Sequence, residues 1–310
     1  MKNSKFDVSI VIVTYNVRDL LRNCLTSIAQ SHAGLSIEVF VVDSGSDKSH
    51  QMVQDEFPEV HIIRNPHNDG FARANNLAIK EAQGKYILIL NPDTELLPTT
   101  LKKCFDYMEK DQKIGVLGCR VELPDGRLDI ACRRSFPTPA VALSRMLFLS
   151  RLFPRSPRFA RYNLTFLPEN EIYPVDCVVG AYMFVRRTVV RDIGLMDEDY
   201  WMYGEDIDFC YRVKKAGWEI IYYPKVKIIH HKGASSGLTK SSSQITSASF
   251  ATKLRTVRAF HEAMHIFYAK HYRSIYPKWL NKVVMIAIQT RLYLAIAALY
   301  LKYRNIFIGG

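Results

Sequence analysis

Several protein classes are disfavoured by what this 310-residue sequence lacks. Its six cysteines form no CxxC pair, which argues against a zinc ribbon or a disulfide framework and favours reduced thiols in a cytosolic setting. The opening residues, MKNSKFD, have no apolar run before a cleavage site, so no signal peptide is expected. The stretch around Gly70 is not GxGxxG, so hydride chemistry with a dinucleotide lacks its usual signature. With 48% hydrophobic and 23% charged residues, a sizeable core is expected and global disorder is excluded.

Acidic residues are scarce in two stretches of this chain, whose formal net charge is +12. Residues 231–310 hold twelve Lys and Arg but a single acid, Glu262, and residues 120–161 hold nine arginines against three acids. Such a balance indicates an anionic partner: nucleic acid, nucleotide or phospholipid surface. No RNA- or DNA-binding module is recognisable, so we expect no nucleic-acid partner. Aromatic residues among the C-terminal cations favour a phospholipid surface or a lipid diphosphate.

Short apolar runs alternate with helical patterns over the first 120 residues. Strands are predicted at residues 8–13, 37–42, 60–63 and 86–90. Because these runs are almost continuously apolar, they predict an α/β fold with a mostly parallel central sheet covered by helices on both faces. In such sheets the ligand lies beyond the carboxyl ends of the strands.

The rest of the chain is organised differently. We predict one domain over residues 1–240, with an Arg- and Pro-rich insertion at 120–173, and a basic helical extension over 241–310. Within the domain we expect strand-like segments at 175–185, 219–223 and 226–231 and a helix at 206–216; a flexible loop is expected at 233–249.

The extension contains one long apolar segment, Val283–Leu301, which nearly reaches the roughly 20 residues that cross a bilayer. Gln289, Thr290 and Arg291 fall at its centre, where an Arg costs at least ~2.5 kcal/mol. The segment therefore favours a peripheral helix, at a membrane or in a subunit contact. The alternatives are a helix packed on the first domain and a true membrane span.

Polar residues follow the predicted strands where each one ends. Thr14, Tyr15 and Asn16 follow the first strand, Asp43 the second and Asp93 the fourth. A carboxylate just past a buried strand can accept a hydrogen bond from a base or ribose, or hold a divalent cation on a diphosphate. Asp and Asn also make ordinary turns, but several such ends on one sheet favour a nucleotide site.

Three further stretches carry candidate chemistry. Residues 65–76 open a helix after the third strand, and Gly70 there allows close approach of the backbone to an anion. Residues 201–209 place three acids in four positions, Glu205, Asp206 and Asp208, behind an aromatic loop. Capping explains one of these acids well and three poorly, so an ionised carboxylate there is a candidate proton acceptor. His230 ends a strand, where a neutral imidazole can join a metal site or bind phosphate.

Taken in order, these pieces resemble glycosyltransferase family two, the inverting sugar-nucleotide transferases of the GT-A fold. The resemblance runs from Val8 to about Ser236 and rests on the segments 11–16, 42–46, 68–72 with Asn75, 91–94, 180–181 and 203–208, and on His230 with Gly233 and Ser235. Arg134-Ser135-Phe136-Pro137 and the Asn-Pro-Asp form of residues 91–93 look most like the rhamnosyltransferase branch of bacterial surface polysaccharide synthesis.

The resemblance implies a role for each matching residue. Asp206 would be the general base, with Glu205 beside it. Asp93 and His230 would hold Mg²⁺ or Mn²⁺ on the donor diphosphate. The first acid of the family's DxD motif is Asn91 here, which leaves one carboxylate for the cation. The donor nucleotide would be bound by Thr14, Tyr15, Asn16, Asp43, Ser44, Gly45, Asn68, Gly70, Arg73 and Asn91, and the acceptor by Trp201, Tyr203, Arg133 and Arg134.

The expected reaction is transfer of a sugar, with rhamnose a candidate, from a dTDP or UDP sugar to a hydroxyl of a glycan or polyprenyl-diphosphate-linked acceptor. The expected location is the cytoplasmic face of the cell membrane, with peripheral contact through the C-terminal region.

Two other functions are compatible with parts of the sequence. His261, Glu262 and His265 fit HExxH, the helical zinc motif of metalloproteases, and His271 stands at the spacing of a third ligand. However, Tyr268 replaces the glycine that would turn the chain toward that ligand, so a continuing helix would point His271 elsewhere. The second alternative is a basic nucleic-acid or membrane-binding protein without catalysis.

Overall fold

The computed structural model describes residues 4–232 and 249–308, with the side chains of the last helix up to Tyr303. The chain divides into two compact units. The main unit comprises the residues up to Asp197 together with Asp206–His231, and the C-terminal unit comprises Glu198–Glu205 and the residues from Lys232 onward. The sequence instead predicts a boundary at residue 240, with residues 198–205 in the first domain. The predicted loop at 233–249 lies almost wholly outside the described residues.

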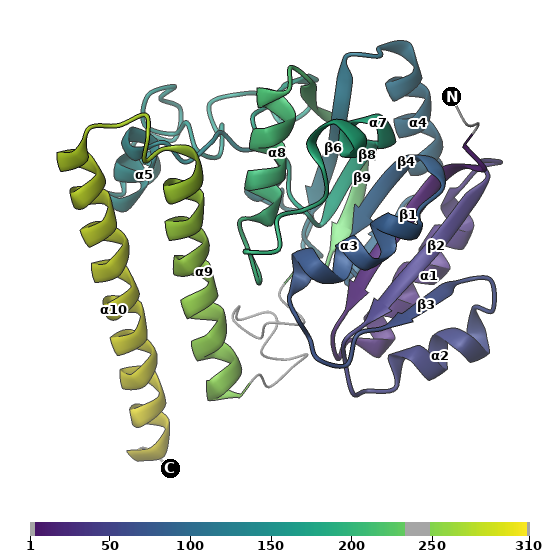
Figure 1. Ribbon diagram of the computed structural model, residues 1–310, viewed down its shortest axis with the longest axis horizontal. Helices are drawn as coiled ribbons and strands as arrows, with labels where there is room; N and C mark the ends of the chain where they lie inside the picture. The colour runs from purple at the N-terminus through teal and green to yellow at the C-terminus, as the bar shows by residue number, and fades with distance from the viewer. Residues whose placement is uncertain (1–3, 233–248, 309–310) are drawn as a thin grey trace. The chain divides into compact units, whose positions relative to one another are not determined.

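The main unit is built on one sheet of nine strands among the described residues, with helices packed against it (Figure 1). The strands are β1 (Phe6–Thr14), β2 (Ile37–Asp43), β3 (His61–Arg64), β4 (Gly84–Leu90), β5 (Thr94–Leu96), β6 (Ile114–Glu122), β7 (Tyr173–Pro174), β8 (Tyr182–Arg186) and β9 (Glu219–His230). The helices of the main unit are α1 (Arg18–Ser31), α2 (Ser49–Glu56), α3 (Phe71–Glu81), α4 (Thr100–Lys110), the 3-10 turn η1 (Ile130–Cys132), α5 (Pro139–Met146), α6 (Leu149–Leu152), α7 (Arg187–Ile193) and α8 (Glu205–Lys215).

The sheet is mixed, in the order β3-β2-β1-β4-β8-β6-β9-β5, and β7 pairs with β9. Strands β3, β2, β1 and β4 run parallel, whereas β8 is antiparallel to both β4 and β6. The runs Val8–Ile12 and Tyr86–Leu90 are buried along their whole length because helices shield the sheet. The predicted mostly parallel α/β sheet is confirmed, with an antiparallel strand beside the parallel four.

Two predicted segments differ from the observed elements. Segment 175–185 is irregular up to β8, because the chain bends at 175–181 to place backbone groups in the site described below. The strands predicted at 219–223 and 226–231 are one strand, β9, whose register against β6 shifts between Tyr223 and Lys227. Pro224 has no N–H to donate, which explains why the pairing is interrupted there without ending the strand.

The C-terminal unit contains two long helices, α9 (Phe250–His271) and α10 (Lys278–Ile308). The helices pack antiparallel: Lys253 donates to the Tyr303 hydroxyl at one end, and the Tyr268 hydroxyl donates to Asn281 at the other. Rings of Phe250 and Tyr303 also meet, with centroids 4.7 Å apart. Within the described residues, the stretch Lys278–Tyr303 is the one helix long and apolar enough to cross a membrane, by length and composition alone.

Candidate active site

The polar strand ends meet at one edge of the sheet in the main unit. Thr14 at the end of β1 pairs in register with Asp43 at the end of β2, and Ile12 pairs with Leu90 at the end of β4. Asn91 and Asp93 follow immediately after β4. The carboxyl ends of these parallel strands therefore bring together three segments that lie far apart in the sequence.

Asp43 is fully buried and anchors the turn after β2. One of its carboxylate oxygens accepts from the Gly45 N–H at 2.8 Å. The other lies 3.1 Å from His50 Nδ1 and also accepts from the Arg64 guanidinium. The sequence analysis proposed Asp43 for the nucleotide but did not foresee His50 and Arg64, which share its carboxylate and fix its orientation.

The turn after β1 interlocks with the turn after β2. Asn16 has a positive φ of 54°, and its side-chain oxygen accepts from the Ser46 N–H at 2.7 Å. A Cβ at Gly45 would lie 2.7 Å from the Asn16 backbone nitrogen, so only glycine fits there. The hydroxyls of Thr14 and Ser44 are buried and have no hydrogen-bond partner in the described residues. Tyr15 is 39% exposed at the same edge. The turns thus present an aromatic ring and unsatisfied hydroxyls beside a fixed carboxylate.

Helix α3 follows β3 in the chain, and Gly70 is the residue immediately before its first turn. The φ of Gly70, 109°, lies in the region that favours glycine. Asn68, two residues earlier, also has a positive φ of 46°. Asp69 and Arg73 form a loose ion pair at 3.8 Å across the first turn of the helix. The N-terminus of a helix can present N–H groups to an anion, so the anion site expected at residues 65–76 stays a prediction.

A histidine between two carboxylates occupies the edge near β4. His230 Nε2 lies 3.2 Å from Asp93 Oδ1, and its Nδ1 lies 3.8 Å from Asp129 Oδ2. The amide of Asn91 is 3.4 Å from the same Nε2. Burial by itself lowers the pKa of His230, but Asp129 and Asp93 outweigh it and raise that pKa to about 9. Burial raises the pKa of Asp93, and His230 outweighs it so that the pKa falls below its usual value. The two groups therefore form an ion pair at neutral pH when no other cation is present.

Asp206 lies in a second buried ion pair. Its Oδ2 accepts from Arg134 Nη2 at 2.5 Å and from the Gly180 N–H at 3.3 Å. Its Oδ1 accepts from the Ile207 N–H at 2.8 Å. Burial disfavours the charge of Arg134, but Asp206 outweighs it and raises the pKa of Arg134 above its usual value. Arg134 also donates to the Val178 carbonyl at 2.8 Å, so the guanidinium is held on two sides.

Hydrogen bonds that involve backbone groups and the Asn91 side chain connect these two ion pairs. Asp206 accepts from the N–H of Gly180, and the carbonyl of the next residue, Ala181, accepts from the Asn91 N–H at 3.2 Å. Asn91 in turn contacts His230, which pairs with Asp93. Acids that lie more than 100 residues apart in the chain are therefore joined through a few residues at one edge of the sheet.

The predicted acceptor residues fall in different places. The Arg133 side chain is 1% exposed, donates to the carbonyls of Leu167 and Pro168, and also contacts the Tyr173 hydroxyl. These contacts bind the insertion to the sheet, and the acceptor contact expected of Arg133 stays a prediction. Arg134 pairs with Asp206. Trp201, Tyr203 and Glu205 belong to the C-terminal unit, a few positions before Asp206 in the chain.

The HExxH segment does not assemble a metal site in the described residues. Helix α9 continues through His271, whose ring packs on Phe267 with centroids 4.9 Å apart. His261 is buried, and its Nδ1 lies 2.8 Å from the Val257 carbonyl of its own helix. No group of three His, Cys, Asp or Glu side chains suited to a metal ion occurs within residues 4–232 and 249–303.

Neither Asp129 nor the pairing of Arg134 with Asp206 was indicated by the sequence pattern. Asp129 caps η1 by accepting from the Ala131 N–H at 3.1 Å, and it follows no buried strand of the kind used to select candidates. The only signal was that Asp129 is one of the three acids within the Arg-rich stretch 120–161. Segment 129–134 thus contributes one residue to each buried ion pair.

Comparison with known proteins defines the class. Residues 9–194 match the family model described as "Glycosyl transferase family 2". Because this match covers more than half of the chain, the protein belongs to glycosyltransferase family 2 and is a glycosyltransferase. The resemblance inferred from the motifs is confirmed.

The individual relatives share 30% or less of their aligned residues with this chain. The chain is 29% identical over 241 residues to an N-acetylglucosaminyl-diphospho-decaprenol L-rhamnosyltransferase of Mycobacterium tuberculosis, covering 74% of this chain and 77% of that protein. It is 30% identical over 173 residues to the rhamnosyltransferase WbbL of Escherichia coli K12, covering 52% and 61%. Among solved structures, GalNAc-T7 with UDP, GalNAc and Mn²⁺ superposes with a TM-score of 0.55 at 18% identity, covering 93% of this chain and 55% of that one. TarS of S. aureus, residues 1–349, gives 0.51 at 15% identity, covering 93% and 80%. These two structures support the GT-A fold.

Proposed function

We propose that the protein is an inverting transferase that moves a sugar, with rhamnose the first candidate, from a nucleoside-diphosphate sugar to a hydroxyl of a surface glycan precursor. The observation that carries this proposal is the chain of contacts from the Arg134–Asp206 pair to the Asp93–His230 pair. A sugar transfer needs a group that accepts the acceptor's proton and a group that faces the leaving diphosphate, and the two pairs supply one of each. The names of the bacterial rhamnosyltransferase relatives support the choice of sugar.

Asp206 is the proposed general base. A carboxylate offers about four lone-pair sites. Contacts within the described residues use two on Oδ2, from Arg134 and Gly180, and one on Oδ1, from Ile207. Oδ1 therefore keeps the capacity to accept the proton of an acceptor hydroxyl as the new C–O bond forms. Attack opposite the leaving diphosphate inverts the anomeric carbon.

Donor binding is proposed for the interlocked turns after β1 and β2. The Asp43 carboxylate is held by three neighbours and would accept from the ribose or base. The unsatisfied hydroxyls of Thr14 and Ser44 give further polar contacts, and the exposed ring of Tyr15 suits stacking on a base. Gly70, Asn68 and Arg73 at the start of α3 are proposed for the same ligand.

A divalent cation fits the site in part. Asp93 and His230 offer one carboxylate oxygen and one imidazole nitrogen, 3.2 Å apart, and Asn91 adds an amide beside them. Because Mg²⁺ is commonly held by one or two carboxylates together with substrate phosphates, the donor diphosphate and water would complete the set. His230 would release its Nε2 proton on ligation. A bound cation supplies positive charge at the departing diphosphate.

The C-terminal unit is proposed to contact the inner face of the cell membrane. Side chains along α10 are apolar and exposed, among them Ile286 and Leu294, each 66% exposed. Arg291, the charge at its centre, lies over the Phe260 ring of α9 at 5.8 Å. The charge is therefore shielded by the neighbouring helix and need not face lipid. The excess of twelve Lys and Arg over one acid from residue 231 onward suits anionic phospholipid.

The test is a panel of dTDP and UDP sugars, with and without Mn²⁺, scored by thermal unfolding and by donor hydrolysis. A true donor at one hundred times its Kd stabilises the protein by about 2.7 kcal/mol. We expect one donor to act selectively and Mn²⁺ to add to its effect. In Asp93→Asn the Mn²⁺-dependent part should vanish while the nucleotide-dependent part stays. If no nucleotide sugar shifts the unfolding temperature, the proposed function is wrong.

A further inference from the structure

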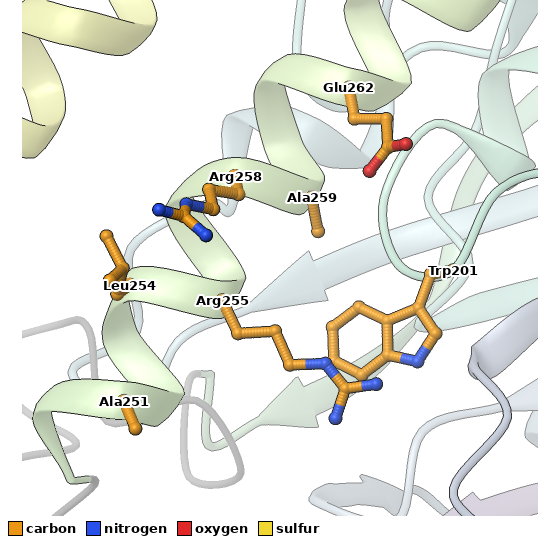
Figure 2. Close-up of a pocket in the computed structure, with 7 residues that line it drawn as sticks. All are labelled: Trp201, Ala251, Leu254, Arg255, Arg258, Ala259 and Glu262. Atoms are coloured by element: carbon orange, nitrogen blue, oxygen red, sulfur yellow. The ribbon is translucent and has the colours of Figure 1, made fainter.

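A pocket of about 360 Å³ lies within the C-terminal unit. Six of its seven lining residues come from α9, and the seventh, Trp201, comes from the segment 198–205 (Figure 2). The lining residues are Trp201, Ala251, Leu254, Arg255, Arg258, Ala259 and Glu262. The donor-binding turns and the proposed base belong to the main unit. Among the residues of this pocket, only Trp201 was expected from the sequence to bind the acceptor.

The charged residues of the pocket share one face of α9. Arg255 and Arg258 are three positions apart, and Glu262 follows four positions later, so successive turns of the helix present them to the same side. Ala251 and Ala259 are small and leave room between them. Two guanidinium groups and one carboxylate give the pocket a net positive charge.

The guanidinium of Arg255 is already oriented. Its central carbon lies 3.7 Å from the centroid of the Trp201 ring, which is close stacking (Figure 2). Stacking uses the flat face of the guanidinium and leaves its N–H groups pointing outward along the edge, where they can donate to an anion. Arg258 and Glu262 form no ion pair with any part of the chain that the structure describes, so the second guanidinium is also available.

This arrangement suits a phosphate carried on an apolar chain. Planar guanidinium groups bind phosphate oxygens through paired hydrogen bonds, and two of them one turn apart match a diphosphate or a phosphodiester. Leu254, the two alanines and the indole offer apolar contact on the same lining. Glu262 would repel a second anion near it and would accept instead from a hydroxyl.

We propose that the pocket of Trp201, Arg255 and Arg258 binds the phosphate or diphosphate head of a lipid, as the recognition site for a lipid-linked acceptor. This proposal rests on the proposed function, since it names the class of acceptor for the same enzyme. The shared chemistry has two natural sources, a prenyl diphosphate and a phospholipid headgroup, and the experiment separates them.

The experiment measures binding calorimetrically to the full chain without any donor present. The probes are geranyl diphosphate, dihexanoyl phosphatidylglycerol below its micelle concentration, and geraniol as the uncharged counterpart. We expect geranyl diphosphate to bind at least ten-fold more tightly than geraniol and more tightly than the phosphatidylglycerol. Arg255→Gln and Arg258→Gln should each weaken that binding about ten-fold, the effect of losing one charge-assisted contact. The matched control is Arg273→Gln, which removes the same charge from an exposed position outside the pocket.

The outcomes separate cleanly. Preference for geranyl diphosphate supports the pocket as the recognition site for a lipid-linked acceptor. Preference for the phosphatidylglycerol would contradict that assignment, because a phospholipid headgroup is not the acceptor of the proposed reaction. The pocket proposal is overturned if neither phosphate probe binds, or if Arg273→Gln weakens binding as much as the two pocket variants do. Failure of donor stabilisation in the nucleotide-sugar panel, with binding of geranyl diphosphate intact, would instead refute the proposed transferase reaction.

Discussion

The two units of this protein differ in how far their functional charged groups are buried. In the main unit, Arg134, Asp206, Asp93 and His230 are nearly excluded from water and each faces an opposite charge. In the C-terminal unit the arginines of α9 are exposed, and so is most of the apolar surface of α10. Chemistry needs groups held in one geometry, and burial in pairs provides that. Recognition of a large amphipathic partner needs accessible surface, which exposed charges and side chains provide.

Removal of the proposed base, a buried group of the main unit, should have the largest effect on activity. Asp206→Asn retains an oxygen for Arg134 but cannot take a proton, so turnover should fall by ~10²–10⁴-fold while donor binding is unchanged. Transfer rate and donor Kd measured on the same preparation would show this. Glu205→Gln is the matched control. If it slows turnover more than Asp206→Asn does, the first acid of the pair is the base.

The buried ion pair should respond very differently from an exposed one. Arg134→Gln leaves the Asp206 carboxylate buried without its cation, which should lower the free energy of unfolding by about 3 kcal/mol. The control is Arg127→Gln, which breaks the exposed pair with Asp125 and should change the free energy by less than ~1 kcal/mol. Urea denaturation measures both. Both pairs lie in the main unit. Equal effects in the two variants would contradict the view that burial makes the Arg134–Asp206 pair matter more for stability than an exposed pair does.

Exposed apolar residues of α10 should matter for membrane binding and little for folding. Ile286→Gln with Leu294→Gln removes two large side chains, each worth about 1.5 kcal/mol or more when buried in lipid. Partitioning onto vesicles rich in phosphatidylglycerol should therefore drop by roughly ten-fold or more, as co-sedimentation would measure. The matched control is Leu152→Gln, an equally exposed leucine of the main unit. A similar loss in this control would argue against α10 as the contact.

The smallest expected effect tests how tightly the donor turns interlock. Gly45→Ala would bring a methyl group against the Asn16 backbone and side chain, so the donor KM should rise roughly five-fold. Gly126→Ala is a control without a steric clash, since nothing lies within 4 Å of the added Cβ, although its φ of +79° adds backbone strain that Gly45 does not have. Steady-state kinetics with varied donor separates the two. An unchanged KM in Gly45→Ala would mean that the turn has room to adjust.

Much of the main unit could be read from local pattern. Strands predicted at 8–13, 37–42, 60–63 and 86–90 correspond to β1, β2, β3 and β4, because a continuous apolar run flanked by turn residues has few other solutions. The helix expected at 206–216 is α8 within one residue at each end. These features depend on neighbours in the chain, so periodicity and turn chemistry are sufficient to find them.

Side chains that meet across the fold were harder to foresee. The assignment of Arg134 to the acceptor took no account of Asp206, which lies 72 residues away in the chain. Gly180 was noted as a motif residue, but its N–H bond to Asp206 depends on a bend at 175–181 that the apolar pattern had suggested was strand. Asp129 was overlooked because it caps a short turn and follows no buried strand.

The sequence alone was enough to identify the apolar strands, the polar groups at their ends and the excess of cations after His231, since each is a local property or a count. The order of the motifs along the chain was enough to indicate the family. Which of those polar groups face one another, and which arginines are buried against an acid or left open to a ligand, depended on the sheet order and on the path of the loops. Electrostatic partners are chosen by distance in space, and a folded chain sets that distance with little regard to separation in sequence.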